Sequence, residues 1–338
     1  MWWLSKRLRD ERGATAVMVG ILMIPLLGFA AISVDVGALH FERAQLQNGA
    51  DAAALAIAQE CAEDNRCDAP GALAKTFADA NSSDGASNVL TPTFPTPKSV
   101  LVTTSSKDAA TGAPSLSHPF ARFIGIDAST VQAKAVAEWG SPLSNSGLPL
   151  AISNCDFAEA EAAATSGSNP KKLVLIRYDT NKTCKGPTGA PIPGGFGWLD
   201  RGGKTCETTV VIGVPPAPNL VQSEPGNSYP GPCDSTMQAL DVPGGTTIAV
   251  PIYNGAESSK GRATSYTLRG FAAFHITGWK LSGGNSMPQV NTDPAAPRCE
   301  GRCRGIQGYF TNSWIDAKNV DGALGGADLG LRVVRLID

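Results

Sequence analysis

One long run without charged residues limits the folding of this chain more than any other feature of its sequence. The run extends from Ala14 to Val34 and contains 21 residues, none of them charged. As a helix it spans about 31 Å, close to the thickness of the hydrocarbon core of a bilayer. Pro25 lies inside the run, and proline is tolerated in membrane helices. The sequence therefore predicts a single membrane anchor that begins at Ala14 and ends at Val34.

The charges on either side of this run predict its orientation. Four basic residues precede it, whereas the stretch 35–49 carries only Arg43. Because cytoplasmic flanks of membrane helices are enriched in Lys and Arg, residues 1–13 are expected in the cytoplasm and everything after Val34 outside it. A cleaved secretory signal is the alternative, but its apolar region would be about 7–15 residues long and would end in an A-x-A pattern. The preceding basic residues are Lys6, Arg7, Arg9 and Arg12.

The cysteines agree with this orientation because all eight follow the apolar run. An even number of cysteines on the exported side is typical of an oxidising compartment and predicts disulfide bonds. Cys61 with Cys67 and Cys299 with Cys303 are close enough in sequence to form local bridges, which leaves three pairings open to the other four. Zinc is the alternative, but no histidine adjoins a cysteine and two C-x2-C motifs are absent. The central cysteines are Cys155, Cys184, Cys206 and Cys233.

The residues after the anchor have the pattern of an amphipathic helix, with apolar residues at spacings of three, four and seven. Anchor and helix are expected to form one rod that is bent or broken at Gly37 or Gly49 and ends near Cys61–Pro70. Small residues allow helices to approach closely, so one face of this rod is a predicted assembly surface. The alternative is that the same face packs on the chain's own α+β unit. The face comprises Leu46, Ala50, Asp51, Ala54 and Ile57.

Short helices and strands are predicted for the rest of the stretch 35–140, which makes it a helical stem with a small α+β unit. Residues 72–80 and 118–126 are typical of short helices, and 99–105 and 130–139 alternate as strands.

Residues 141–147 have the composition of a linker, and from residue 148 to 338 strand candidates alternate with Gly/Pro turns. The predicted fold class is therefore α+β, with a β-rich second domain whose expected form is a sandwich. One further helix is predicted at 156–164.

No class of catalytic or nucleic-acid site is predicted. The net charge of -2 supplies no basic field for nucleic acid, and G-x-S-x-G and H-E-x-x-H motifs are absent. Ser168 and Lys171 match S-x-x-K, but they lie in a turn-rich stretch without the companion elements. His118 and His275 are expected to have structural roles. No catalytic residue, metal ion or cofactor is therefore predicted.

A binding module for a carbohydrate or protein ligand on a membrane anchor is the alternative function. Aromatic side chains on loops can bind sugars or peptides, although most pack in cores. An exposed row of them would favour binding, and a buried set would favour a scaffold. The aromatic residues of the β-rich part are Trp198, Trp279, Tyr309, Phe310 and Trp314.

About 50 N-terminal residues resemble the TadG-like proteins of the bacterial Tad (tight adherence) Flp-pilus system. The features that carry the resemblance are Arg12-Gly13, the apolar span with Pro25, Asp35-x-Gly37, and the segment from Glu42-Arg43 through Leu46-Gln47-Asn48 to Ala50–Ala56. The later segments HPFARFIG and VQAKAVAEWG resemble the pilin-like part of actinobacterial relatives.

The resemblance implies a non-enzymatic, minor-pilin-like protein of the cell membrane that acts in pilus assembly or surface adhesion. Its implied partners are the cytoplasmic membrane and pilin-like subunits. Prepilin peptidases cut after a glycine and prefer Glu at the fifth mature position; Gly13 fits, but that fifth residue is Met18. The uncut tail is therefore expected to stay on the chain. A D-x-S-x-S metal motif, which some relatives carry, is absent.

Overall fold

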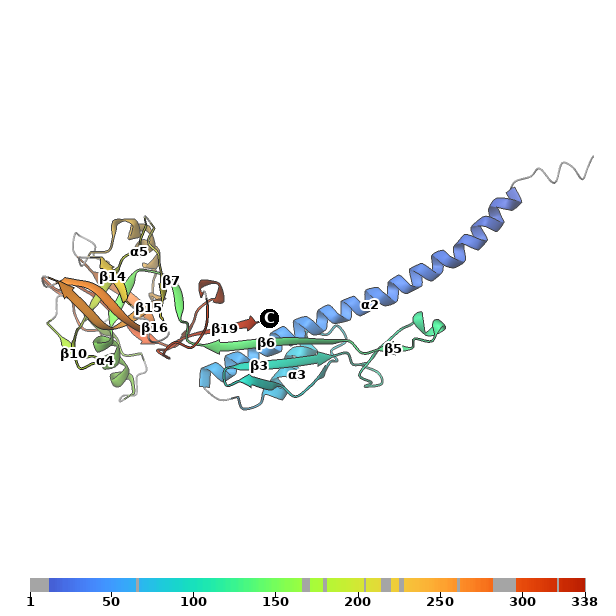
Figure 1. Ribbon diagram of the computed structural model, residues 1–338, viewed down its shortest axis with the longest axis horizontal. Helices are drawn as coiled ribbons and strands as arrows, with labels where there is room; N and C mark the ends of the chain where they lie inside the picture. Colours follow the sequence, from blue (N-terminus) through green and yellow to red (C-terminus); the bar gives the residue numbers. More distant parts are fainter. Residues whose placement is uncertain are drawn as a thin grey trace, which may run out of the picture. The chain divides into compact units, whose positions relative to one another are not determined.

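Two compact units make up the chain in the computed structural model (Figure 1). Unit 1 ends at Glu138 and also includes the C-terminal residues from Leu336, and unit 2 comprises Trp139–Arg335. The α+β class predicted from the sequence is confirmed. The structure describes residues 12–64, 67–165, 171–178, 181–203, 205–213, 220–224, 228–259, 262–281, 296–320 and 322–337, so most of the basic N-terminal tail lies outside the described residues.

Helix α2 (Arg12–Asp64) is the longest element of unit 1 and continues without interruption over 53 residues. It passes through Gly37 and Gly49 as a smooth curve, so the predicted bend or break at a glycine does not occur (Figure 1). At Gly49 the reason is packing. A Cβ atom there would lie 3.2 Å from Cα of Ala78 in helix α3 (Pro70–Ala80). Tertiary contact thus outweighs the roughly 1 kcal/mol by which glycine disfavours a helix.

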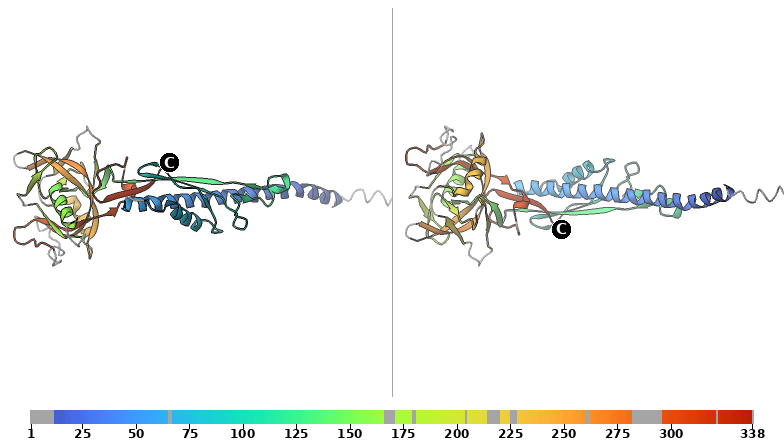
Figure 2. Two further views of the ribbon diagram at one scale, coloured as in Figure 1. Left: turned by 90° about the horizontal axis from the view of Figure 1, so that it is seen from below. Right: turned by 90° about the horizontal axis from the view of Figure 1, so that it is seen from above.

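A small antiparallel sheet packs against α2 and completes unit 1, as Figures 1 and 2 show. Strand β3 lies between β1 and β6, and β2 also pairs with β3. Thr104 of β3 is fully buried, and its Oγ1 donates a hydrogen bond to the Leu46 carbonyl of α2 at 2.9 Å. The strands are β1 (Asn88–Val89), β2 (Thr93–Thr96), β3 (Ser99–Ser105) and β6 (Gln132–Gly140). The buried cross-strand pairs are Val100–Ala137, Val102–Ala135 and Thr104–Ala133.

Unit 2 is built on strands that close into a ring, which differs from the expected sandwich. β15 pairs antiparallel with β16 and parallel with β8. β8 pairs antiparallel with β12, and β12 pairs antiparallel with β14. β14 in turn pairs antiparallel with β16, and this last pairing closes the ring. β16 is long enough, at 19 residues, to hold β15 along one edge and β14 and β17 along the other. The bounds are β8 (Leu150–Ser153), β9 (Val174–Arg177), β12 (Phe196–Leu199), β14 (Leu220–Glu224), β15 (Thr246–Ser259), β16 (Arg262–Lys280) and β17 (Gly305–Thr311).

Short helices and strand pairs surround this ring. β17 extends the sheet to β9, β7 pairs with β13, β10 with β11, and β18 with β19. The predicted helix 156–164 lies within α4. The remaining elements of unit 2 are β7 (Ser144–Gly147), α4 (Asn154–Thr165), β10 (Thr183–Lys185), β11 (Pro191–Pro193), β13 (Thr208–Val211), η2 (Gly231–Cys233), α5 (Asp234–Leu240), β18 (Ser313–Trp314), η3 (Ala317–Asn319) and β19 (Leu331–Ile337).

Residues 141–147, predicted as a linker, are part of unit 2. Strand β7 pairs antiparallel with β13, and Ser144 and Asn145 are buried. The small polar residues of this stretch resemble a linker in composition. Composition does not reveal that the backbone N–H and C=O groups find partners on a strand more than sixty residues later in the sequence.

All eight cysteines form disulfides, and the two local bridges, Cys61–Cys67 and Cys299–Cys303, are those predicted. The sequence left three pairings open for the central four. The structure pairs Cys155 with Cys184 and Cys206 with Cys233, each linking neighbours in sequence order across 29 and 27 residues.

We predict that replacing Gly49 by leucine destabilises unit 1 by about 1–3 kcal/mol, because the added side chain would meet the backbone of α3 rather than a movable side chain. The measurement is thermal and denaturant unfolding of the full chain in detergent. Gly71→Leu is the matched control, since a Cβ at Gly71 meets nothing within 4 Å. Equal stability of the two variants would contradict the packing role of Gly49.

We also predict that the disulfides contribute unequally to stability. The chain-entropy term gives about 3.5 kcal/mol for the 29-residue Cys155–Cys184 loop and about 2 kcal/mol for the 4-residue Cys299–Cys303 loop. The double substitution Cys155→Ala/Cys184→Ala should therefore lower the unfolding midpoint in urea more than Cys299→Ala/Cys303→Ala. The reverse order would show that local packing, not loop closure, governs these bridges.

Candidate functional site

The apolar surface of α2 is the first candidate site. Large apolar side chains from Val17 to Val36 are exposed, and Ile24 is 76% exposed. Within the described part of the chain, α2 is the one helix long and apolar enough to cross a membrane. The predicted anchor residues Ala14, Pro25 and Val34 all lie on it. A bilayer would remove this apolar surface from water, which supports single-pass anchoring.

Asp35 connects the end of this surface to a distant loop. It follows the uncharged run directly and is only 4% exposed. Its Oδ2 accepts hydrogen bonds from the backbone N–H groups of Phe120 at 3.2 Å and Ala121 at 2.5 Å. These groups open the short helix η1 (Ala121–Ile124), which lies between the paired strands β4 (Leu116–Ser117) and β5 (Ala128–Ser129). The predicted helix at 118–126 is thus a single 3-10 turn fastened to α2.

The sequence pattern does not predict this role for Asp35. The residue is part of the Asp35-x-Gly37 feature of the TadG-like resemblance, which gives it no physical function. The available signal was an acidic residue at the first position after a membrane-length run, where an unpaired charge is costly. Its partners lie 85 and 86 residues away, so the sequence pattern did not indicate them.

Both histidines considered for catalysis have structural contacts instead. His118 is buried; its Nε2 is 2.8 Å from Ser129 Oγ, and its backbone N–H donates to Asp127. His118 lies between β4 and η1, and these contacts connect it to β5 and to the residue that precedes β5. The ring of His275 is 2.9 Å from Thr247 Oγ1 and 2.7 Å from the Gly244 carbonyl, and it stacks on Tyr309.

Ser168 of the S-x-x-K match lies outside the described residues.

The predicted assembly face of α2 is occupied by the chain itself. Leu46, Ala50, Ala54 and Ile57 are buried in unit 1, against α3 and β3. Asp51 is half-buried and accepts a hydrogen bond at 2.8 Å from Gln47, whose side chain also bonds the Lys134 carbonyl. Of the two alternatives that the sequence left open for this face, the structure shows packing on the chain's own α+β unit. The helix still offers Phe41, which is 62% exposed.

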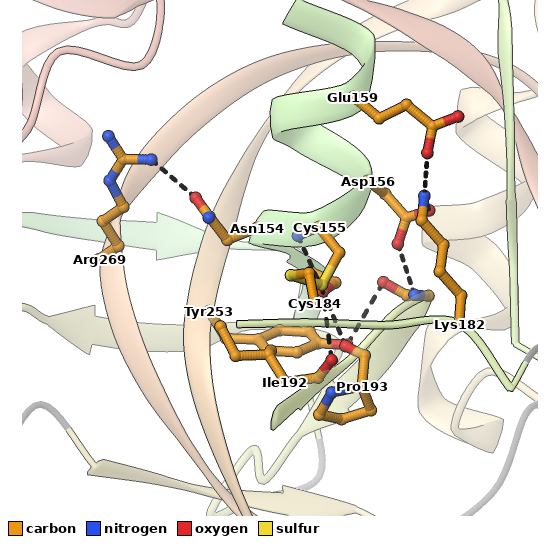
Figure 3. Close-up of a disulfide and its surroundings, with 12 residues drawn as sticks. Asn154, Cys155, Asp156, Glu159, Lys182, Cys184, Ile192, Pro193, Tyr253 and Arg269 are labelled. Atoms are coloured by element: carbon orange, nitrogen blue, oxygen red, sulfur yellow. Dashed lines mark hydrogen bonds and ion pairs between the residues drawn. A yellow bond between two sulfur atoms is a disulfide. The ribbon is translucent and has the colours of Figure 1, made fainter. Parts of the chain in front are cut away.

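A cluster of charged groups surrounds the Cys155–Cys184 disulfide in unit 2 (Figure 3). Asp156 accepts hydrogen bonds from Lys182 Nζ at 3.0 Å and from the Gly195 N–H at 2.6 Å. Lys182 also reaches Glu159 at 2.5 Å. Partial burial lowers the pKa of Lys182, but the hydrogen bonds and charges of Glu159 and Asp156 outweigh it and hold the pKa above its usual value. Lys182 therefore stays charged and fixes the start of α4.

The aromatic residues of unit 2 are mostly part of its core. Trp198 and Trp279 are almost fully buried, and Phe310 packs against Phe157 and Phe274. Trp314 alone of the five considered is exposed. The residues therefore do not form an exposed row, and this arrangement favours a scaffold over a sugar-binding platform. In the described ranges, no group of three or more His, Cys, Asp or Glu residues is placed to hold a metal ion.

Residues 13–60 match the family model described as putative Flp pilus-assembly TadE/G-like. No curated protein and no solved structure matches the chain. The matched segment contains nearly all of α2, including the exposed apolar half, Asp35 and the half buried in unit 1. The N-terminal residues 13–60 of the chain are therefore similar to the putative Flp pilus-assembly TadE/G-like family.

Proposed function

We propose that the chain is a non-enzymatic, minor-pilin-like protein of the cell membrane that acts in Flp pilus assembly or surface adhesion. The main support for the proposal is that the TadE/G-like match covers a single helix, α2, whose two halves have different surfaces. The first half of α2 exposes an apolar surface of membrane length, and the second half forms the core of unit 1. One continuous helix therefore joins an anchor to a folded stem, which is the design expected of a pilin-like subunit.

The proposed orientation places residues 1–13 in the cytoplasm and everything after Val34 outside it. Two independent features support this topology. The basic residues before the run follow the positive-inside bias. The four disulfides all lie after the run, and disulfides persist in oxidising compartments outside the cytoplasm.

The partners that we propose are pilin-like or pilus-assembly subunits in the same membrane. Because Leu46 and Ile57 are buried within unit 1, another subunit would contact the exposed part of α2 between the bilayer and the sheet. Phe41 is the large apolar residue of that part, seven residues beyond Val34 and therefore about 10 Å above the end of the uncharged run. An unidentified surface ligand of unit 2 would account for an adhesive role.

We predict that deleting the gene abolishes Flp pili or surface attachment, and that the full chain restores them. A photo-crosslinking residue at Phe41 should capture a pilus-system subunit, whereas the same residue at Phe94, an exposed phenylalanine of β2, should not. Pilus counts, attachment assays and mass spectrometry of the crosslinked bands are the measurements. Normal pili together with normal attachment in the deletion strain would contradict the proposed function.

We further predict that the N-terminal tail is retained. In cleaved pilins, Glu at the fifth mature position pairs with the new amino terminus of a neighbour, and Met18 cannot form such a pair. Retaining the tail also keeps four basic residues at the cytoplasmic surface, where moving each charge through the bilayer would cost several kcal/mol. The intact mass of the membrane-extracted protein should include residues 1–13. A chain that begins at Ala14 would show that it is processed as a filament subunit.

A further inference from the structure

The loop that Asp35 holds beside α2 has an unusually apolar surface. Phe123 is 77% exposed and Ile126 is 50% exposed, and Phe120 is also exposed. These three residues lie within seven positions of one another, around η1. Nothing in unit 1 covers them among the residues that the structure describes. Exposed aromatic and aliphatic side chains gathered on one turn mark an interaction surface.

The position of this loop on α2 indicates what covers it. The hydrogen bonds from Phe120 and Ala121 end on Asp35, the first residue after the uncharged run. The neighbouring helix residues Val34 and Val36 are themselves exposed, so the loop and the end of the apolar run form adjoining surfaces. In Figures 1 and 2 the β4–β5 region lies beside α2, toward the apolar half of the helix. At that height the surroundings of a membrane-spanning α2 are lipid headgroups.

The loop is built to hold its apolar side chains outward. Gly125 has a φ of +86°, and this left-handed conformation, which glycine adopts readily, reverses the chain after η1. The N–H groups of Gly125 and Ile126 donate to the carbonyls of Arg122 and Ala121, both at 3.1 Å. The turn therefore keeps Phe123 and Ile126 in place without a core of its own.

The charges of the loop are balanced, so apolar side chains rather than a net charge would bring it to a membrane surface. Arg122 lies over the ring of Phe123, with its guanidinium carbon 5.2 Å from the ring centroid. Asp127, also exposed, offsets the charge of Arg122. A loop with balanced charges does not depend on anionic lipid, and aromatic residues favour the boundary between headgroups and acyl chains.

We propose that the loop Phe120–Ile126 is a second membrane contact, which inserts Phe120, Phe123 and Ile126 into the headgroup region where α2 leaves the bilayer. Asp35 is its positioning residue. The contact would fix the tilt and rotation of the stem on the membrane, because the anchor then meets the bilayer at two points rather than one. This inference rests on the membrane anchoring of α2 proposed above.

The experiment uses the full chain in phosphatidylcholine nanodiscs with a fluorescent probe on an added cysteine, Phe123→Cys. All eight native cysteines are in disulfides and do not take up the label. A lipid that carries a nitroxide near its headgroup should remove most of the emission of this probe. Phe77→Cys is the control, because Phe77 is an exposed residue of α3, the helix that contacts α2 at Gly49, about 21 Å beyond Asp35. Its emission should persist.

Equal emission from the probes at positions 123 and 77 would overturn the inference. So would a probe at 123 that is shielded from water but not quenched by lipid, because a protein would then cover the loop. A third probe, Ile24→Cys, separates the two proposals. If it is quenched only by nitroxides deep in the bilayer while position 123 remains bright, anchoring holds and the loop contact fails. If position 24 is not quenched at all, the anchoring itself fails.

The role of Asp35 is tested by adding Asp35→Ala to the Phe123→Cys variant. The quenching at position 123 should fall, because the loop loses both hydrogen bonds to α2. Asp51→Ala is the matched control, since Asp51 is an acidic residue of the same helix that bonds Gln47 instead of the loop. Unchanged quenching in the Asp35→Ala variant would overturn the assignment of Asp35 as the positioning residue.

Discussion

The structure of this protein depends on how the apolar surface of one uninterrupted helix is covered. The first half of α2, up to Val36, exposes many large apolar side chains, and a bilayer would cover such a surface. The second half, from Leu46 to Ala62, buries a single face against α3 and β3. The same helix thus has an exposed apolar half and a half that packs within unit 1, and Asp35 lies between these two halves. Its Oδ2 atom accepts hydrogen bonds from two backbone N–H groups, and these stabilise the carboxylate.

Small residues determine how closely unit 1 packs on that helix. The buried face of α2 is rich in alanine, and the β6 residues paired with the buried positions Val100, Val102 and Thr104 of β3 are alanines as well. Side chains of this size contribute little apolar area each, so stability depends on close approach of the backbones. Gly49 is the extreme case, where the backbone of α3 occupies the space of a side chain. A face with this composition is suited to assembly with other helices, and in this chain it serves intramolecular packing.

Unit 2 is held together by strand pairing and disulfides rather than by close packing on a helix. Its long strands β15 and β16 hold the shorter strands in a ring, and three disulfides join the surrounding loops and short helices. Its large aromatic residues are drawn into the core, where Trp198 and Trp279 are almost fully buried. The function proposed for the chain therefore rests on α2 and the elements packed on it, whereas unit 2 is a disulfide-linked β domain in which Trp314 is the exposed member of the five aromatic residues considered.

Features that depend on local pattern can be predicted from the order of the amino acids alone. The uncharged run, the amphipathic period after it, the alternation at Ser99–Ser105 and the two closely spaced cysteine pairs each specify their structure within a few residues. Features that depend on partners far apart in the chain arise only when the chain folds. The fold selects the central disulfide pairing, makes residues 144–147 a strand, closes the ring through β14 and β16, and keeps α2 uninterrupted at Gly49. It also brings Phe120 and Ala121 to Asp35. The physical reason is that hydrogen bonds and close packing across such separations arise from the folded arrangement, and no periodic pattern in the sequence encodes them.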